Sequence, residues 1–249
     1  MANYTISETF TLPSKGLIYD KPINPDITLR SMTTIEEMKR LSPTKTPFTA
    51  MSEVIESCIV GKPEMKVCDM FIGDYQFLLH KLRIVTYGPE YKTINICPYC
   101  GEVKEEIFNL EDLDVNEYTD DFKDLLYIHL PQSDKDVKLR LQTPRLLDNI
   151  QRKKEDMLSK NKDMPDPSLV LTLQSLIETV DGRTLNNVEL ENFVQNLPMK
   201  DTNLILNTAE KINKKVGIDT TMFTTCESCG RTNLSTFRIT SEFFGPTND

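Results

Sequence analysis

The sequence predicts an α+β fold in which short β elements near both ends of the chain carry an inserted, mainly helical region. Two observations support this prediction. The phrase C-P-Y-C-G at residues 97–101 returns almost unchanged as C-E-S-C-G at 226–230, and β-prone residues flank both phrases. Between the phrases, apolar residues recur at helical spacing beside helix start and stop signals. We therefore expect a β/helical part made of residues 1–118 plus 221–249, and a mainly helical insert over residues 119–220.

Composition indicates a globular protein and argues against several classes of function. Of 249 residues, 39% are hydrophobic and 27% are charged, which allows a core in one or two domains. The formal net charge of −9 argues against nucleic-acid binding, which usually needs a basic face. No stretch reaches the roughly 18–20 apolar residues that a membrane span requires. The N-terminus lacks the features of a signal peptide, so we expect a cytoplasmic chain whose six cysteines stay reduced, which favours metal ligation over disulfides for those that lie in pairs.

The segments before the first phrase carry signals for strands and for three helices. Residues 7–30 contain β-formers around a Pro-Ser-Lys-Gly turn, and Thr33 with Glu36 forms a capping box that opens a short helix. A second helix over residues 47–59 places Cys58 on an apolar face, where we expect a small core residue. A third helix over residues 74–87 ends at Gly88.

Strands are expected beside both cysteine phrases, and helices dominate between them. The segments T-I-N-I before the first phrase, V-K-E-E-I-F-N-L after it and L-S-T-F-R-I-T after the second read as strands. A hairpin turns at Pro-Gln-Ser-Asp, residues 131–134. Four helices are then expected, and the second should run as far as Val180. Their start or stop signals are Thr143-Pro144, Asp166-Pro167 with Asp181-Gly182, Asn186 with Glu189, and Gly217.

The two phrases predict one shared structural zinc site with Cys97, Cys100, Cys226 and Cys229 as ligands. Two thiolates separated by two residues can both face one ion, and the following Gly supplies a backbone position free of Cβ. Two such turns give Cys₄, the closed coordination of structural zinc, and the flanking strands complete a zinc ribbon. The 125 residues from 101 to 225 exceed the roughly fifteen to twenty of compact sites, which indicates an insertion. We expect the metal to staple the first half of the chain to its C-terminal end.

Other interpretations of the cysteines are weaker. Two metal-free turns would leave the repeated Gly unexplained. A thioredoxin-like pair at Cys97 and Cys100 would need a helix start, whereas Gly101 and a strand-like segment follow. A catalytic zinc usually keeps an open position, which four thiolates do not leave.

We find no signature of an enzyme or of a small-molecule substrate. His80 lies on the helix face away from Leu78 and Leu82, which favours a surface or interface position, and His129 alternates with Tyr127 on a strand. Neither histidine has a nucleophile nearby in sequence, and no glycine-rich phosphate loop occurs.

The C-terminal segment I-T-S-E-F-F-G-P contains an aromatic pair, Phe243 and Phe244. This pair can fold back onto the core, or it can dock on a partner, since exposed aromatic residues anchor interfaces. We regard both residues as candidates for partner binding.

In order along the chain, several segments resemble the baseplate hub subunit and hub-assembly family of T4-like contractile-tailed bacteriophages. They are L-P-S-K-G-L-I-Y, D-I-T-L-R-S-M-T-T-I-E-E-M-K-R-L, D-Y-Q-F-L-L-H-K-L-R-I-V-T-Y-G, C-P-Y-C-G, and C-E-S-C-G with the tail F-F-G-P. The resemblance implies a non-enzymatic structural or chaperone-like protein whose partners are other baseplate and tail proteins. It implies a location in the virion tail baseplate, or a transient presence in the infected bacterial cytoplasm. The cysteines are the only site residues that the resemblance transfers to this chain, and the metal they would bind is inferred from the spacing of the cysteines.

A zinc-ribbon adaptor that binds nucleic acid or the transcription machinery is the alternative function. The acidic charge and the lack of interleaved arginine and aromatic residues count against it.

Overall fold

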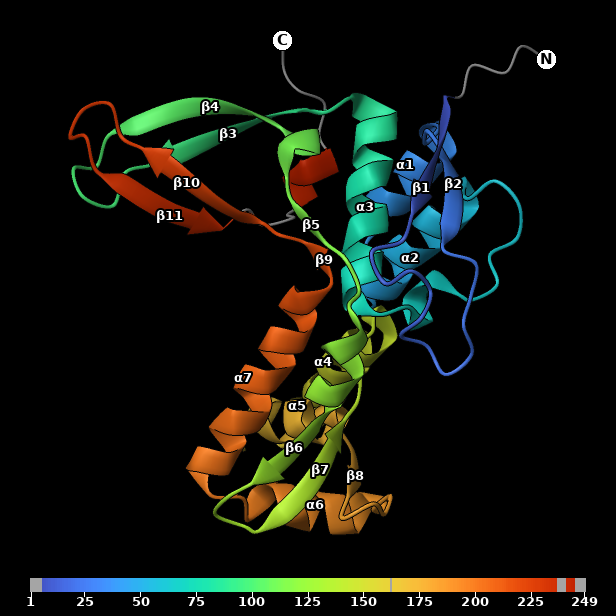
Figure 1. The fold of residues 1–249 in the computed structure, drawn as a ribbon, viewed down its shortest axis with the longest axis vertical. Helices are drawn as coiled ribbons and strands as arrows, with labels where there is room; N and C mark the ends of the chain where they lie inside the picture. Colours follow the sequence, from blue (N-terminus) through green and yellow to red (C-terminus); the bar gives the residue numbers. More distant parts are fainter. Residues whose placement is uncertain (1–5, 162, 237–240, 245–249) are drawn as a thin grey trace.

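The computed structural model describes residues 6–161, 163–236 and 241–244. It contains an N-terminal body, an arm that projects to one side, and a mainly helical lower part (Figure 1). The α+β prediction is confirmed, because helices alternate with several small antiparallel sheets. Among the described residues, no helix combines the length and apolar character needed to cross a membrane.

The N-terminal body is built around one long, almost fully buried helix, α3, which ends at Gly88 as expected. The capping box at the start of α1 is confirmed, with the Thr33 N–H donating to the Glu36 carboxylate at 2.8 Å. Cys58 is a fully buried core residue at the end of α2. The elements of this body are β1 (Ser7–Thr11), β2 (Asp26–Arg30), α1 (Thr34–Leu41), α2 (Pro47–Cys58), the 3₁₀ turn η1 (Val67–Asp69) and α3 (Ile72–Tyr87).

A buried carboxylate ties the N-terminal turn to α3. Asp74 accepts hydrogen bonds from the Tyr19 hydroxyl at 2.5 Å and from the Ser14 N–H at 3.1 Å. Burial raises the pKa of Asp74, and these hydrogen bonds oppose that shift. The turn between β1 and β2 is therefore fixed by a polar contact inside the core.

The lower part combines four helices with a three-stranded antiparallel sheet in the order β6-β7-β8. The helix expected to reach Val180 ends instead at Leu176, and Ile177–Val180 forms strand β8 beside β7. Ile177, Thr179 and Val180 are β-branched, so they suit a strand once β7 offers an edge. The elements are η3 (Asp120–Leu126), β6 (Tyr127–Leu130), β7 (Lys135–Leu139), α4 (Pro144–Lys160), α5 (Ser168–Leu176), β8 (Ile177–Val180), α6 (Asn187–Gln195) and α7 (Met199–Lys215).

One cluster of buried apolar side chains includes residues of both the body and the lower part. Phe71 before α3 packs edge-on against Phe122 of η3, with ring centroids 5.9 Å apart. The proposed division between residues 118 and 119 therefore crosses a shared core, and it stays a prediction.

The chain passes between the two parts at a narrow junction where β5 (Val115–Asn116) pairs with β9 (Gly217–Ile218). Here α3 lies against the segment that leaves α7. A Cβ added to Gly73 would lie 2.1 Å from the carbonyl oxygen of Val216, so only glycine fits at this crossing.

The arm consists of two antiparallel hairpins that lie side by side (Figure 1). The first hairpin follows α3, and the second follows β9. The 3₁₀ turn η2 (Leu110–Asp112) leads from the first hairpin back to the junction. Their strands are β3 (Glu90–Ile96), β4 (Val103–Asn109), β10 (Thr221–Thr225) and β11 (Thr232–Thr236).

The aromatic pair near the C-terminus is buried, which corrects its assignment to partner binding. Phe243 and Phe244, in the 3₁₀ turn η4 (Ser241–Phe244), are 0% and 3% exposed. The Phe243 ring lies 5.6 Å from the Tyr91 ring, and its carbonyl accepts a hydrogen bond from the buried Arg83 at 2.7 Å. The pair folds back onto α3 because this site provides aromatic neighbours and a donor for its backbone.

His80 is also buried, so its expected surface position is wrong. Its Nε2 atom lies 2.8 Å from the carbonyl oxygen of Leu110, and its ring stacks on Phe243 with centroids 6.0 Å apart. The helix face opposite Leu78 is covered as well, because the segments around Leu110 and Phe243 pack on it. Sequence periodicity did not reveal this second covering layer.

Candidate metal centre

Both cysteine phrases fold into the same turn at the tip of the arm. The Cys97 N–H donates to the Glu102 carbonyl at 2.8 Å, and the Gly101 N–H donates to the Cys97 carbonyl at 2.9 Å. In the second phrase the same bonds run from Cys226 to Arg231 at 3.0 Å, and from Gly230 to Cys226 at 2.8 Å.

The glycine of each phrase is required by its backbone conformation. Gly101 has φ = +76° and Gly230 has φ = +69°, in the left-handed region that favours glycine. No atom lies within 4 Å of a Cβ built on either residue, so space does not impose the choice.

The four predicted ligands come together across the two hairpins. The Sγ atoms of Cys97 and Cys229 are 3.8 Å apart, and those of Cys100 and Cys226 are 3.6 Å apart. All four ligand atoms lie within 4.8 Å of one another. In a regular tetrahedron with metal–sulfur bonds of about 2.3 Å, the sulfur–sulfur edge is about 3.8 Å. The residues present therefore fit a tetrahedral metal ion, and each of the two short contacts joins one hairpin to the other.

The electrostatics of the four thiols favour cation binding. The backbone N–H of Tyr99 lowers the pKa of Cys97 to about 7. The Glu102 N–H also lowers the pKa of Cys100, but hydrogen bonding to the neighbouring thiols Cys97, Cys226 and Cys229 outweighs it and raises that pKa to about 12. Four sulfurs this close cannot all ionise without compensation, and a divalent metal ion supplies that charge.

Polar contacts connect the inner faces of the two hairpins. The Asn95 amide donates to the Thr224 hydroxyl at 3.1 Å, and Lys104 pairs with Glu227 at 2.6 Å. The Arg231 guanidinium lies 5.1 Å from the ring centroid of Tyr99. A cavity of about 150 Å³ lined mainly by polar residues lies between the hairpins beside Cys97 and Cys226. The interior of the arm is therefore polar.

The outer faces of the arm expose several apolar side chains, which sequence reasoning missed. The β3–β4 register places Ile96 opposite Val103 and puts Ile94 and Ile107 on the same face. These four side chains are 60–70% exposed. On the other hairpin, Phe223 and Leu234 are paired in register and are 76% and 58% exposed. The T-I-N-I alternation signalled an apolar face, but not that this face would point outward.

The two remaining cysteines lie outside the metal centre. Burial raises the pKa of the Cys58 thiol to about 11. Cys68 is buried near η1, where Arg145 donates to its sulfur at 2.8 Å. Both thiols are held protonated and inside the body, which suits packing better than metal binding.

Comparison with protein families gives one assignment that covers nearly the whole chain. The family model described as T4 bacteriophage base plate protein matches residues 3–245. Comparisons with curated proteins and with solved structures gave no match. The matched range includes both hairpins of the arm, the body and the lower part. The chain therefore belongs to the family of T4 bacteriophage base plate proteins.

Proposed function

We propose that this baseplate protein is a non-enzymatic structural or assembly protein of the tail baseplate hub, and that it acts through contacts with other tail proteins. Family membership supports the baseplate location in the virion tail. The ordered segments that resemble hub proteins support the hub assignment. The observation that carries the proposal is the arm, which presents exposed aliphatic side chains on two hairpins whose four cysteines fit a metal ion.

Zn²⁺ is the proposed metal, held by Cys97, Cys100, Cys226 and Cys229. Four thiolates fill a tetrahedral site and leave no position for substrate, so the ion has a structural role. Isolated two-stranded hairpins are marginally stable in water, and the polar inner faces bury little apolar surface. The metal therefore makes the arm a rigid unit, and we expect close to one zinc ion per chain by metal analysis.

The exposed aliphatic side chains favour a partner that encloses the arm. Ile94, Ile96, Val103 and Ile107 lie on one outer face, whereas Phe223 and Leu234 lie on the opposite one. Burial of the four aliphatic residues contributes roughly 4–8 kcal/mol, because full burial of each is worth about 1.5–3 kcal/mol and only the 60–70% of each side chain that is exposed remains to be buried. Association costs about 4–15 kcal/mol, so one face alone is marginal. A cleft in another baseplate protein that covers both faces would bind more tightly than a flat surface.

The test is co-purification of the full chain with the other baseplate proteins of the same phage. We expect Ile94→Asp to reduce recovery of the partners at least about tenfold, because it places a charge in an apolar contact. The matched control is Ile35→Asp on α1, since Ile35 is 65% exposed and lies outside the arm. It should leave recovery unchanged, and circular dichroism and zinc content should match the wild type in both variants.

Two outcomes would reject the proposal. A lone monomer under every co-expression condition would remove the assembly role. Binding to duplex or single-stranded nucleic acid with a steep salt dependence would instead favour the adaptor function.

A further inference from the structure

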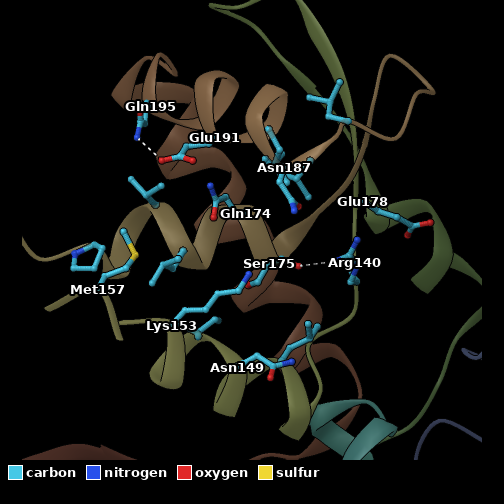
Figure 2. Close-up of a pocket in the computed structure, with 18 of the residues that line it drawn as sticks. Arg140, Asn149, Lys153, Met157, Gln174, Ser175, Glu178, Asn187, Glu191 and Gln195 are labelled. Atoms are coloured by element: carbon cyan, nitrogen blue, oxygen red, sulfur yellow. Dashed lines mark hydrogen bonds between the residues drawn. The ribbon is translucent and has the colours of Figure 1, made fainter. Parts of the chain in front are cut away.

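A second surface, far along the chain from the metal ligands, has the chemistry of a peptide-binding site. A pocket of about 790 Å³ opens in the lower part between α4, α5 and α6, with β8 at one side (Figure 2). Its lining has a largely aliphatic floor. The residues of this floor are Leu146, Ile150, Met157, Val170, Leu171 and Leu190.

The basic groups of the pocket lack carboxylate partners. Arg140 donates only to the Ser175 carbonyl at 3.5 Å, and Arg152 donates to the Asn149 amide oxygen at 3.1 Å. The Lys153 side chain makes no hydrogen bond or ion pair with any described residue, and it reaches toward Ser175 of α5 (Figure 2). In a chain with a net charge of −9, three unpaired cations around one pocket are unusual.

The acidic groups of the pocket are mostly engaged elsewhere. Asp166 pairs with Lys154 at 2.9 Å, and Glu178 pairs with Lys138 at 2.8 Å. Glu191 accepts a hydrogen bond from Gln195 at 3.2 Å and has no cationic partner among the described residues. The three cations therefore face one uncompensated carboxylate, which leaves an excess of positive charge over an aliphatic floor.

Side-chain amides complete the lining. The side chains of Gln174 and Asn187 project from α5 and α6, and neither side chain makes a hydrogen bond with a described residue (Figure 2). Amides can donate to and accept from a peptide backbone. The lining thus offers apolar contact, backbone hydrogen bonding and recognition of carboxylates.

We propose that this pocket binds a segment of another baseplate protein in which aliphatic residues stand beside aspartate or glutamate. Nucleic acid fits poorly, because no aromatic side chain lines the pocket to stack on a base. A phosphorylated small molecule fits poorly as well. The first free N–H groups of α6 are already bonded to Asn186, and no glycine lines the pocket. This inference rests on the proposed function in one respect, namely that the bound segment belongs to another baseplate protein.

A photo-crosslink within the full chain tests this inference. p-Benzoylphenylalanine replaces Gln174, and the chain is co-expressed with the other baseplate proteins of the same phage. After illumination, mass spectrometry identifies the crosslinked peptide. We expect an adduct with another baseplate protein, in a stretch that contains aliphatic residues and carboxylates.

Charge reversal shows whether the adduct depends on the pocket. Arg152→Glu with Lys153→Glu should reduce the adduct at least about tenfold, because like charges then face the partner's carboxylates. The matched control, Lys200→Glu with Lys211→Glu, makes the same charge change on exposed positions of α7 outside the pocket. It should leave the adduct unchanged. Both double variants change exposed side chains, and thermal melts will verify that they fold.

Three results would overturn the inference: no adduct, an adduct with a second copy of this chain, or an adduct that charge reversal leaves intact. Co-purification is measured in the same samples. If baseplate proteins co-purify without an adduct, the pocket inference fails and the proposed function stands. If no baseplate protein co-purifies, the proposed function fails, and the pocket inference fails with it.

Discussion

Removal of the metal should unfold the arm and leave the body intact. Without the ion, the contacts that join the inner faces of the hairpins among the described residues include Asn95 with Thr224, Arg231 with Tyr99, and the exposed pair of Lys104 with Glu227. The first is worth about 1 kcal/mol, the second about 0.5–1 kcal/mol, and an exposed ion pair adds little. Structural zinc contributes about 10 kcal/mol or more in small zinc modules. The metal therefore dominates the cohesion of the arm.

The body does not depend on the arm in the same way. The exposed apolar side chains of the arm, such as Ile94 and Phe223, are absent from the buried cluster. Most of α3 is instead covered by β2, α2, α7 and β9, and the arm reaches this core only at its base, where Tyr91 of β3 packs against Phe243. Loss of the arm beyond Tyr91 should thus leave the main core unchanged.

Hydrogen exchange measured by mass spectrometry will test this separation. With a zinc chelator, or in Cys226→Ser, amides of β3, β4, β10 and β11 should lose protection, while those of α3 and α7 keep theirs. Ser228→Ala, which changes an exposed residue between the cysteines, is the matched control. If α3 loses protection in parallel with the arm, the metal supports the whole chain and the reasoning is wrong. If no amide changes, the metal has no structural role.

Three further predictions concern the body. Gly73→Ala should destabilise the protein by roughly 3 kcal/mol or more in urea melts. Alanine gains about 1 kcal/mol in helix propensity, but its Cβ would lie 2.1 Å from the Val216 carbonyl oxygen and clash with it. A variant as stable as the wild type, or more stable, would refute the close crossing. Burial lowers the pKa of His80 to about 4, so the folded state resists a protonation that the unfolded chain accepts. The free energy of unfolding should then fall by up to roughly 3 kcal/mol as pH drops from about 6.5 to about 4. If the wild type and His80→Gln show the same pH dependence of stability in urea melts, this prediction is wrong. Arg83 donates to the carbonyls of Phe243, Gly88 and Glu90 at 2.7, 2.8 and 3.3 Å. Arg83→Met should cost roughly 3 kcal/mol and speed proteolysis near residues 241–244, whereas unchanged digestion would show that the tail is held by its rings alone.

Local signals predicted most of the helices because their physical causes are local. Thr33 with Glu36 and Asn186 with Glu189 form the expected capping boxes, and the Thr143 hydroxyl caps α4. A cap depends on residues three or four positions apart, so the sequence contains all the necessary information. The cysteine phrases were equally informative, because the turn and its glycine are fixed within five residues.

Features that depend on distant neighbours were not predictable. Ile177 to Val180 continue a helical pattern, and only the free edge of β7 makes them a strand. His80 is buried by Phe243 and by the segment at Leu110, and these three come from remote parts of the chain. The outward direction of Ile94 and Ile107 follows from how the hairpins face each other. Periodicity identifies an apolar face, but not the surface that covers it.

The structure also changes the physical meaning of the long spacing between the cysteine pairs. The sequence suggested that the metal closes a loop of 125 residues. In the structure, β5 pairs with β9 at the root of the arm, and Gly73 contacts the segment around Val216 just below it. Protein contacts have therefore already brought both hairpins together before any ion binds. The metal joins only two neighbouring hairpin tips. Its binding free energy therefore stabilises the ordered structure of the arm and does not have to close the loop formed by the insert. Metal binding can then determine whether the exposed aliphatic side chains of the arm are held in a fixed arrangement, while the body stays folded in either case. This property suits a protein whose contacts are made during assembly.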